Sequence, residues 1–139
     1  MFERIAVAVD GSEGSRRAAE VAAEIARRDG AELVLVHVDE RMATKGRADV
    51  HPDEELIQEG IRRLAGDLDA SGVPTSVRMA TVMAGGAGHV VAEVAGEEGA
   101  DLIVAGTRGH SSLAGLLVGS VTHRLLHVSA VPVLVVPSA

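Results

Sequence analysis

The sequence contains no cysteine, no tryptophan and no tyrosine, and Phe2 is its only aromatic residue. Without cysteine the chain forms no disulfides, which is compatible with a reducing compartment. Proteins that bind nucleic acids use basic patches and stacking rings. This chain instead has 13 Lys and Arg against 20 Asp and Glu, which gives a net charge of −7. The composition therefore argues against nucleic acid as a partner.

Long hydrophobic runs are missing too. Only five apolar residues lie between Arg4 and Asp10, which is too few for the core of a signal peptide. No run approaches the roughly 20 apolar residues that a membrane-spanning helix needs. A hydrophobic content of 47% excludes wholesale disorder, and 139 residues suit one domain. We therefore expect a single cytoplasmic domain over residues 1–139 with no membrane partner.

Strand-like and helix-like segments alternate along the chain. Apolar runs at 5–9, 33–38 and 102–105 predict strands buried on both faces, and 133–136 predicts the last strand. The alternating segment 75–82 suits an edge strand. Segments 12–29, 52–70, 87–98 and 119–129 have the periodicity of helices. Ser12 or Ser15 can cap the first helix and Gly30 stops it, and Glu54 is one of the acids in the first turn of the second. The last helix is expected to bury Val121, Leu125 and Val128. The pattern predicts an α/β fold, a doubly wound parallel sheet of five strands with helices on both faces. Segment 39–51 is charged and weakly patterned, and we interpret it as a linker.

The most informative motif joins the fourth predicted strand to the last predicted helix. It consists of Gly106-Thr-Arg-Gly109, nine further residues, and then Gly119-Ser120. Glycines let a backbone approach a ligand closely and adopt positive φ, and the free N–H groups of a helix start attract anions. Ser120 adds a hydroxyl donor and Arg108 a permanent cation. The motif fits a phosphate site, and it equally fits a flexible loop in which Ser120 caps the helix.

Other polar residues have two interpretations each. Asp10 lies at the carboxyl end of the first predicted strand, where doubly wound folds bind ligands, but it also suits a turn before Gly11. His37 alternates with apolar neighbours, so we interpret it as a core residue or one that supports a site. His123 and His127 are four residues apart and can share a metal, although helix-surface histidines are the preferred interpretation.

The spacing Gly106-x2-Gly109-x9-Gly119-Ser120 resembles the nucleotide-binding signature of the universal stress protein family. The resemblance covers essentially the whole chain, since 5–12, 35–38, 100–104 and 132–136 are similar to that family's first, second, fourth and fifth strands. It implies a Rossmann-like sheet with strand order 3-2-1-4-5, ATP binding and homodimers. Ala87 departs from the proline that the family often has after the third strand, which affects only the local turn.

The resemblance also implies roles for residues at matched positions. Asp10 would hold the ribose or a nucleotide-bound metal such as Mg²⁺, and the backbone of Val38 would contact adenine. Ala8 and Val9 would lie beside the base. The ribose and phosphates would be lined by Gly106, Gly109, Gly119, Ser120 and Val121, with Arg108 and His110 nearby.

Three functions are compatible with these features. The first is an ATP-binding sensor or regulator in a stress response. The second is a slow ATPase or other phosphoryl-transfer enzyme, and the third is a nucleotide-free structural dimer. The chain has no Walker A sequence, its only lysine is Lys45, and no residue is an obvious base for positioning water. We therefore expect regulation, and we assign no catalytic residue.

The last predicted strand has no charged residue to protect its edge. Pro132 interrupts only its start, and the residues that follow are Val133, Leu134, Val135 and Val136. An apolar edge of this kind recruits another strand or aggregates. We expect homodimerisation in which this strand pairs with its own copy. The alternative is a monomer in which the C-terminal tail or a helix covers the edge.

Overall fold

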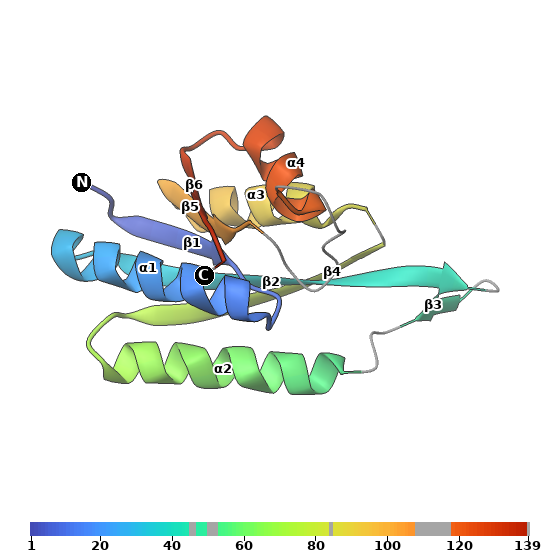
Figure 1. Ribbon diagram of the computed structural model, residues 1–139, viewed down its shortest axis with the longest axis horizontal. Coiled ribbons are helices and arrows are strands. Elements are labelled where there is room, and N and C mark those ends of the chain that lie inside the picture. Colours follow the sequence, from blue (N-terminus) through green and yellow to red (C-terminus); the bar gives the residue numbers. More distant parts are fainter. Residues whose placement is uncertain (45–46, 50–52, 84, 108–117, 139) are drawn as a thin grey trace.

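A computed structural model describes residues 1–44, 47–49, 53–83, 85–107 and 118–138. Strands and helices alternate along the chain as predicted (Figure 1). In chain order they are β1 (Arg4–Ala8), α1 (Glu13–Asp29), β2 (Glu32–Thr44), β3 (Arg47–Asp49), α2 (Glu54–Ala70), β4 (Thr75–Met83), α3 (Ala87–Glu97), β5 (Leu102–Gly106), α4 (Ser120–Val128) and β6 (Val133–Val136). No helix in these ranges is long and apolar enough to cross a membrane.

The parallel strands lie in the order β4-β2-β1-β5-β6. Counting only these five along the chain, this is the predicted order 3-2-1-4-5, which is confirmed. The register pairs Val7 of β1 with Leu35 of β2 on one side and with Val104 of β5 on the other. β1 is therefore the central strand, and β4 and β6 form the two edges of the parallel sheet.

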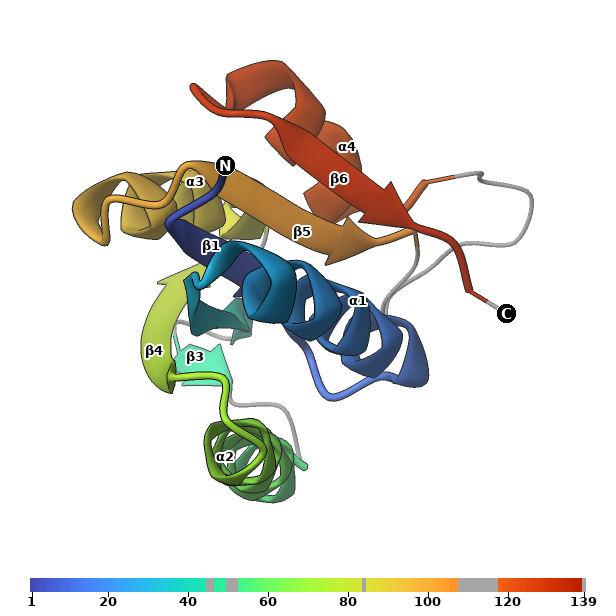
Figure 2. The ribbon, with the colours of Figure 1, turned by 90° about the vertical axis from the view of Figure 1, so that its left-hand side faces the viewer.

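Helices cover both faces of the sheet (Figures 1 and 2). On one face, α1 and α2 pack against a cluster that includes Ile5, Val7 and Leu35. On the other face, α3 and α4 pack against a cluster that includes Ala6 and Ile103. Successive residues of β1 alternate between the two clusters, as the two-residue period of a strand requires. The continuous apolar runs of β1 and β5 therefore form strands that are buried on both faces.

Helix α1 begins and ends at the predicted signals. The hydroxyl of Ser12 accepts a hydrogen bond from the backbone N–H of Ser15 and caps the first turn. Gly30 ends the helix in the left-handed conformation with φ 70°, which glycine adopts without steric cost. Between these ends the buried face consists largely of alanines, and these small side chains let the helix lie close to the sheet.

The predicted linker at 39–51 is wrong over most of its length. β2 continues to Thr44 and pairs with β4 as far as Arg41 opposite Met83, well beyond the end of β1 (Figure 1). β3 then pairs with β2 in antiparallel fashion, with Thr44 opposite Arg47. Cross-strand hydrogen bonds satisfy the backbone N–H and carbonyl groups of this segment. It therefore forms strands, although its charged composition by itself indicates a loop.

The buried face of α4 also differs from the prediction. Leu125 is buried as expected, but Thr122 is the second buried residue, while Val121 and Val128 are only half-buried. The hydroxyl of Thr122 donates to the carbonyl of Gly106 over 2.7 Å, so a polar residue is satisfied inside the fold. This bond ties α4 to the end of β5.

Candidate functional site

The carboxyl ends of β1, β2 and β5 meet at one end of the sheet. From β1 the chain passes to α1 on one face, and from β5 it passes to α4 on the other face. Ligands of doubly wound sheets bind in the crevice at such a reversal. Ala8, Val9 and Asp10 lie at the end of β1, with Val38 on β2 and Gly106 at the end of β5.

Asp10 shapes the turn between β1 and α1. Its Oδ1 accepts hydrogen bonds from the backbone N–H of Ser12 over 3.0 Å and from the Ser12 hydroxyl over 2.5 Å. The Asp10 N–H donates to the hydroxyl of Ser15 over 3.2 Å. Gly11 between them has φ 84°, which strongly favours glycine. The turn-forming interpretation is thus confirmed, and the turn places a half-buried carboxyl group at the crevice.

The start of α4 is fixed beside the end of β5. The Gly119 N–H donates to the Thr107 carbonyl over 2.5 Å, and the Thr107 N–H donates to the carbonyl of Val136 over 3.0 Å. Gly119 is the N-cap, and its carbonyl accepts from His123 over 2.9 Å. The first N–H groups of an α-helix have no partner inside the helix, and the helix dipole makes this end positive. Ser120 and Val121 therefore supply donors suited to a phosphate group.

Gly119 does not have the positive φ expected from the sequence. Its φ of −65° and ψ of 163° are extended values that any residue adopts. Arg108, Gly109 and His110, the remaining predicted phosphate-site residues, lie outside the described residues.

A buried histidine–carboxylate pair lies beside the crevice. His37 on β2 and Glu54 on α2 are 3% and 5% exposed. The Nε2 atom of His37 lies 2.9 Å from Oε2 and 3.2 Å from Oε1 of Glu54. Gln58 donates to the same Oε2 over 2.6 Å. On the other side of the ring, Nδ1 lies 2.9 Å from the carbonyl of Val9.

The sequence suggested a supporting role for His37 but not its partner. We interpreted Glu54 only as an acid in the first turn of a helix, where the dipole favours it. The missed signal is its spacing, since Glu54 precedes the buried residues Ile61 and Leu68 by one and two heptads. That spacing places Glu54 on the buried face of α2, where a carboxyl group needs a partner.

Asp39 is a second buried acid that the sequence did not reveal, because it fell in the presumed linker. It is 3% exposed, and its Oδ2 accepts from the Nε of Arg41 over 3.0 Å. Within the described part of the chain, its Oδ1 has no hydrogen-bond partner. His37 and Asp39 are two residues apart on β2 and lie on the same face of the strand. Buried polar groups thus collect at the end of the sheet where ligands bind in this fold class.

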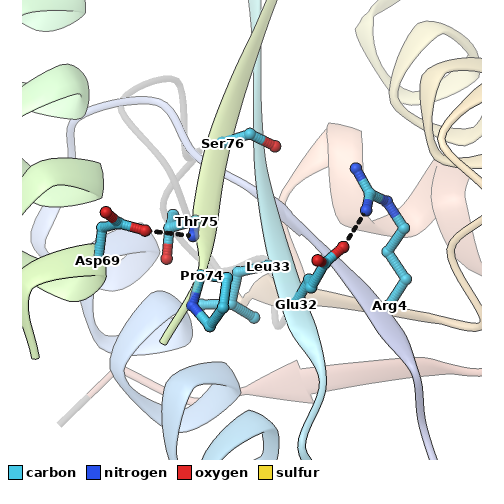
Figure 3. A pocket seen from close by; sticks show the side chains of 7 residues that line it. All are labelled: Arg4, Glu32, Leu33, Asp69, Pro74, Thr75 and Ser76. Carbon is cyan, nitrogen blue, oxygen red and sulfur yellow. Dashed lines mark hydrogen bonds and ion pairs between the residues drawn. The ribbon is translucent and has the colours of Figure 1, made fainter. Parts of the chain in front are cut away.

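A pocket of about 310 Å³ opens at the opposite end of the sheet (Figure 3). Arg4 in its wall turns toward Glu32 and is also paired with Glu98 over 2.8 Å, and Asp69 accepts from the Thr75 N–H (Figure 3). The cation is therefore already engaged, and the other charged groups of the wall are acidic. The pocket is poorly suited to a phosphate-bearing ligand.

Glu98 links two arginines on the face covered by α3. It accepts from Arg4 over 2.8 Å and from Arg78 over 2.6 Å, and Arg78 also contacts Glu97 over 2.9 Å. The hydrogen bonds from Arg4 and Arg78 lower the pKa of Glu98 below its ordinary value. This network joins β1 and β4 to the end of α3 and lies away from the crevice.

Comparison with known proteins gives consistent results. A family model described as "Universal stress protein family" matches residues 1–137. Universal stress protein YxiE of Bacillus subtilis is 33% identical over 148 residues, which cover 98% of this chain and 99% of the relative. A universal stress protein solved in complex with cAMP has a TM-score of 0.70 and 28% identity, covering 99% of this chain and 98% of that one. The structure of MJ0577 shares the fold, with a TM-score of 0.80 at 21% identity, and covers 100% of this chain and 98% of the other.

Proposed function

The chain belongs to the universal stress protein family, and from this premise we propose that it binds ATP in the crevice at the carboxyl ends of β1, β2 and β5. The observation that carries the proposal is the start of α4, whose first N–H groups have no partner within the helix and lie beside the end of β5. A family member 28% identical to this chain was solved with cAMP, an adenine nucleotide, which supports this ligand class.

We assign a partner to each part of the nucleotide. The backbone of Val38 would contact the adenine edge, and Ala8 and Val9 would lie beside the ring. The carboxyl group of Asp10 would hold the ribose hydroxyls or Mg²⁺ bound to the phosphates. The phosphates would be bound by the start of α4, Gly106, Arg108, Gly109 and His110. The full glycine motif between β5 and α4 supports a triphosphate as the ligand.

The protein would then act as a regulator whose state depends on the bound nucleotide. Nucleotide binding at the start of α4 would change the surface at this end of the sheet, and a partner would recognise the nucleotide-bound state. This role requires binding without fast turnover.

Homodimerisation through β6 is the second part of the proposal. β6 pairs only with β5 among the described strands, and its residues are apolar, with Leu134 37% exposed. The carbonyl of Pro137, just after the strand, accepts from Arg17 on α1 over 3.2 Å. This contact supports a tail that turns toward α1 instead of covering the β6 edge. A two-fold axis through the edge would pair β6 with its copy and close both sheets.

Calorimetric titration with ATP and Mg²⁺ tests nucleotide binding. The matched control is Asp10→Asn, because asparagine keeps an oxygen that accepts from Ser12 and preserves the turn while removing the charge. We expect the native protein to bind and the variant to bind several-fold more weakly. No heat of binding up to millimolar ATP would rule out the proposal. Because the chain has no Trp or Tyr, any co-purified nucleotide also shows directly in the ultraviolet absorbance of the native protein.

A further inference from the structure

The hydrogen-bond ladder between β1 and β2 ends one bond earlier than the regular parallel pattern would. The last pair is Ala8 with Val36, and the Val9 N–H still donates to the Val36 carbonyl over 2.9 Å. In a continuing parallel ladder the carbonyl of Val9 would accept from the N–H of Val38. Among the described residues this bond is not formed. The Val9 carbonyl instead forms a hydrogen bond with the His37 ring, whose Nδ1 atom lies 2.9 Å from the carbonyl oxygen.

Without this bond, the backbone N–H and carbonyl of Val38 point toward the candidate site at the end of β1. Val36 and Val38 are two residues apart, so their backbone groups point to the same side of β2, which is the side of β1. Opposite Val38, however, the chain has already entered the Asp10 turn. One N–H and one carbonyl therefore face the candidate site side by side. They complement the edge of adenine, where the ring N1 accepts and the 6-amino group donates, and they mismatch guanine, where these roles are reversed.

The ring of His37 is held rigidly in this position. A carbonyl oxygen only accepts hydrogen bonds, so Nδ1 must carry the hydrogen that lies between it and Val9. On the far side of the ring, Glu54 contacts Nε2, and Gln58 fixes Glu54 from the next turn of α2. His37 and Glu54 are both buried, so neither group exchanges its partner for water without cost.

We propose that His37 is a positioning residue for nucleotide selection: by capping the Val9 carbonyl, it keeps the Val38 backbone out of the strand ladder and available to the adenine base. Glu54 and Gln58 orient the ring. This inference rests on the proposed function, because it assigns the base-recognition part of the same site. It adds that preference for adenine over guanine depends on a side chain that does not itself touch the nucleotide.

Two substitutions of His37 distinguish the contact at Nδ1 from the contact at Nε2. Asparagine places its amide nitrogen where Nδ1 lies and keeps the bond to Val9, whereas glutamine places it near Nε2 and keeps only the contact with residue 54. Both are made in a Glu54→Gln background, so that no buried carboxylate is left without a partner. A purely structural role for the buried pair predicts similar nucleotide affinity for both proteins.

The readouts are the dissociation constants for ATP and GTP, with thermal melting to confirm folding. We expect His37→Gln to bind ATP about tenfold more weakly than the Glu54→Gln parent, since the Val38 N–H would donate to the freed Val9 carbonyl and no longer to the base. Its preference for ATP over GTP should shrink in proportion. His37→Asn should restore both values to within about threefold of the parent. Equal affinities in two folded variants would overturn the inference.

Amide hydrogen exchange without nucleotide tests the ladder itself. In the native protein we expect the Val38 amide to exchange at least about tenfold faster than the Val36 amide, which lies within the ladder. In His37→Gln, the freed Val9 carbonyl becomes available to Val38, and its exchange should slow, whereas in His37→Asn it should stay fast. A native Val38 amide as protected as that of Val36 would overturn the inference. If the native protein binds no ATP, the proposed function fails, and the exchange data still decide whether His37 caps the ladder.

Discussion

Replacing Gly88 with alanine should separate α3 from α4. A Cβ on Gly88 would lie 2.6 Å from Cβ and 2.7 Å from Cγ of Arg124, and 3.0 Å from the backbone oxygen of Val121. The first two distances are shorter than any normal carbon–carbon contact, and a Cβ of Arg124 cannot move without moving α4. Because Val121 is in the first turn of α4, the displacement would reach the proposed phosphate site.

Gly96→Ala on the same helix is the matched control. A Cβ there meets nothing within 4 Å. Alanine in place of glycine in a helix gains about 0.5–1 kcal/mol, and this gain is roughly shared by the two variants. Forcing an extra carbon into a packed contact costs about 1–3 kcal/mol. We therefore expect Gly88→Ala to be about 1 kcal/mol less stable than the native protein and Gly96→Ala to be slightly more stable.

Urea denaturation and ATP titration of the two variants provide the assay. A loss of about 1 kcal/mol corresponds to a melting temperature lowered by roughly 3–4 °C in a chain of this size. Gly88→Ala should also bind ATP more weakly, whereas Gly96→Ala should bind it as the native protein does. If Gly88→Ala is as stable as Gly96→Ala, the close contact between α3 and α4 does not constrain the fold, and the reasoning is refuted.

Three further predictions concern other parts of the molecule. The hydrogen bonds from Arg4 and Arg78 lower the pKa of Glu98 in the folded state, so its stabilising effect is present at neutral pH and is lost as the pH falls through that lowered pKa. The difference in urea midpoint between the native protein and Glu98→Gln should therefore shrink from pH 7 to pH 3. Ser12→Ala removes the cap of α1 and a partner of Asp10, and should lower the unfolding free energy by about 1 kcal/mol. Ser12→Asn, which also caps and adds no charge beside Asp10, should lower it less. Val135→Lys places a charge on the β6 edge and should give a monomer of 14.3 kDa or aggregates by light scattering; an unchanged dimer would show that another surface joins the subunits.

Regular periodicity made most of the fold predictable. Buried strands gave continuous apolar runs, and capping signals such as Ser12 and Gly30 marked the ends of α1. The order of the strands came from the resemblance to a family, because periodicity carries no information about which strands are neighbours. The extension of β2 to Thr44 could not be predicted, since it depends on cross-strand bonds to β4 and β3 and not on the residues' own preferences.

The candidate site was predictable only in part. Asp10 and Gly119 could be proposed from the sequence because strand ends and glycine motifs are typical of ligand sites. The contact between His37 and Glu54 was missed because it joins residues 17 apart, and only their proximity in the fold shows that they act together. The interrupted ladder at Val9 is likewise a property of backbone geometry, which leaves no trace in residue types.

The central claim is that an adenine nucleotide binds at the carboxyl ends of the strands, and mapping of backbone amide shifts during an ATP titration tests it most directly. The account predicts that the largest shifts occur at Val9, Val38, Gly106 and Gly119, around the crevice. Shifts concentrated at Leu33, Thr75 and Ser76, which line the pocket at the opposite end of the sheet, would contradict it.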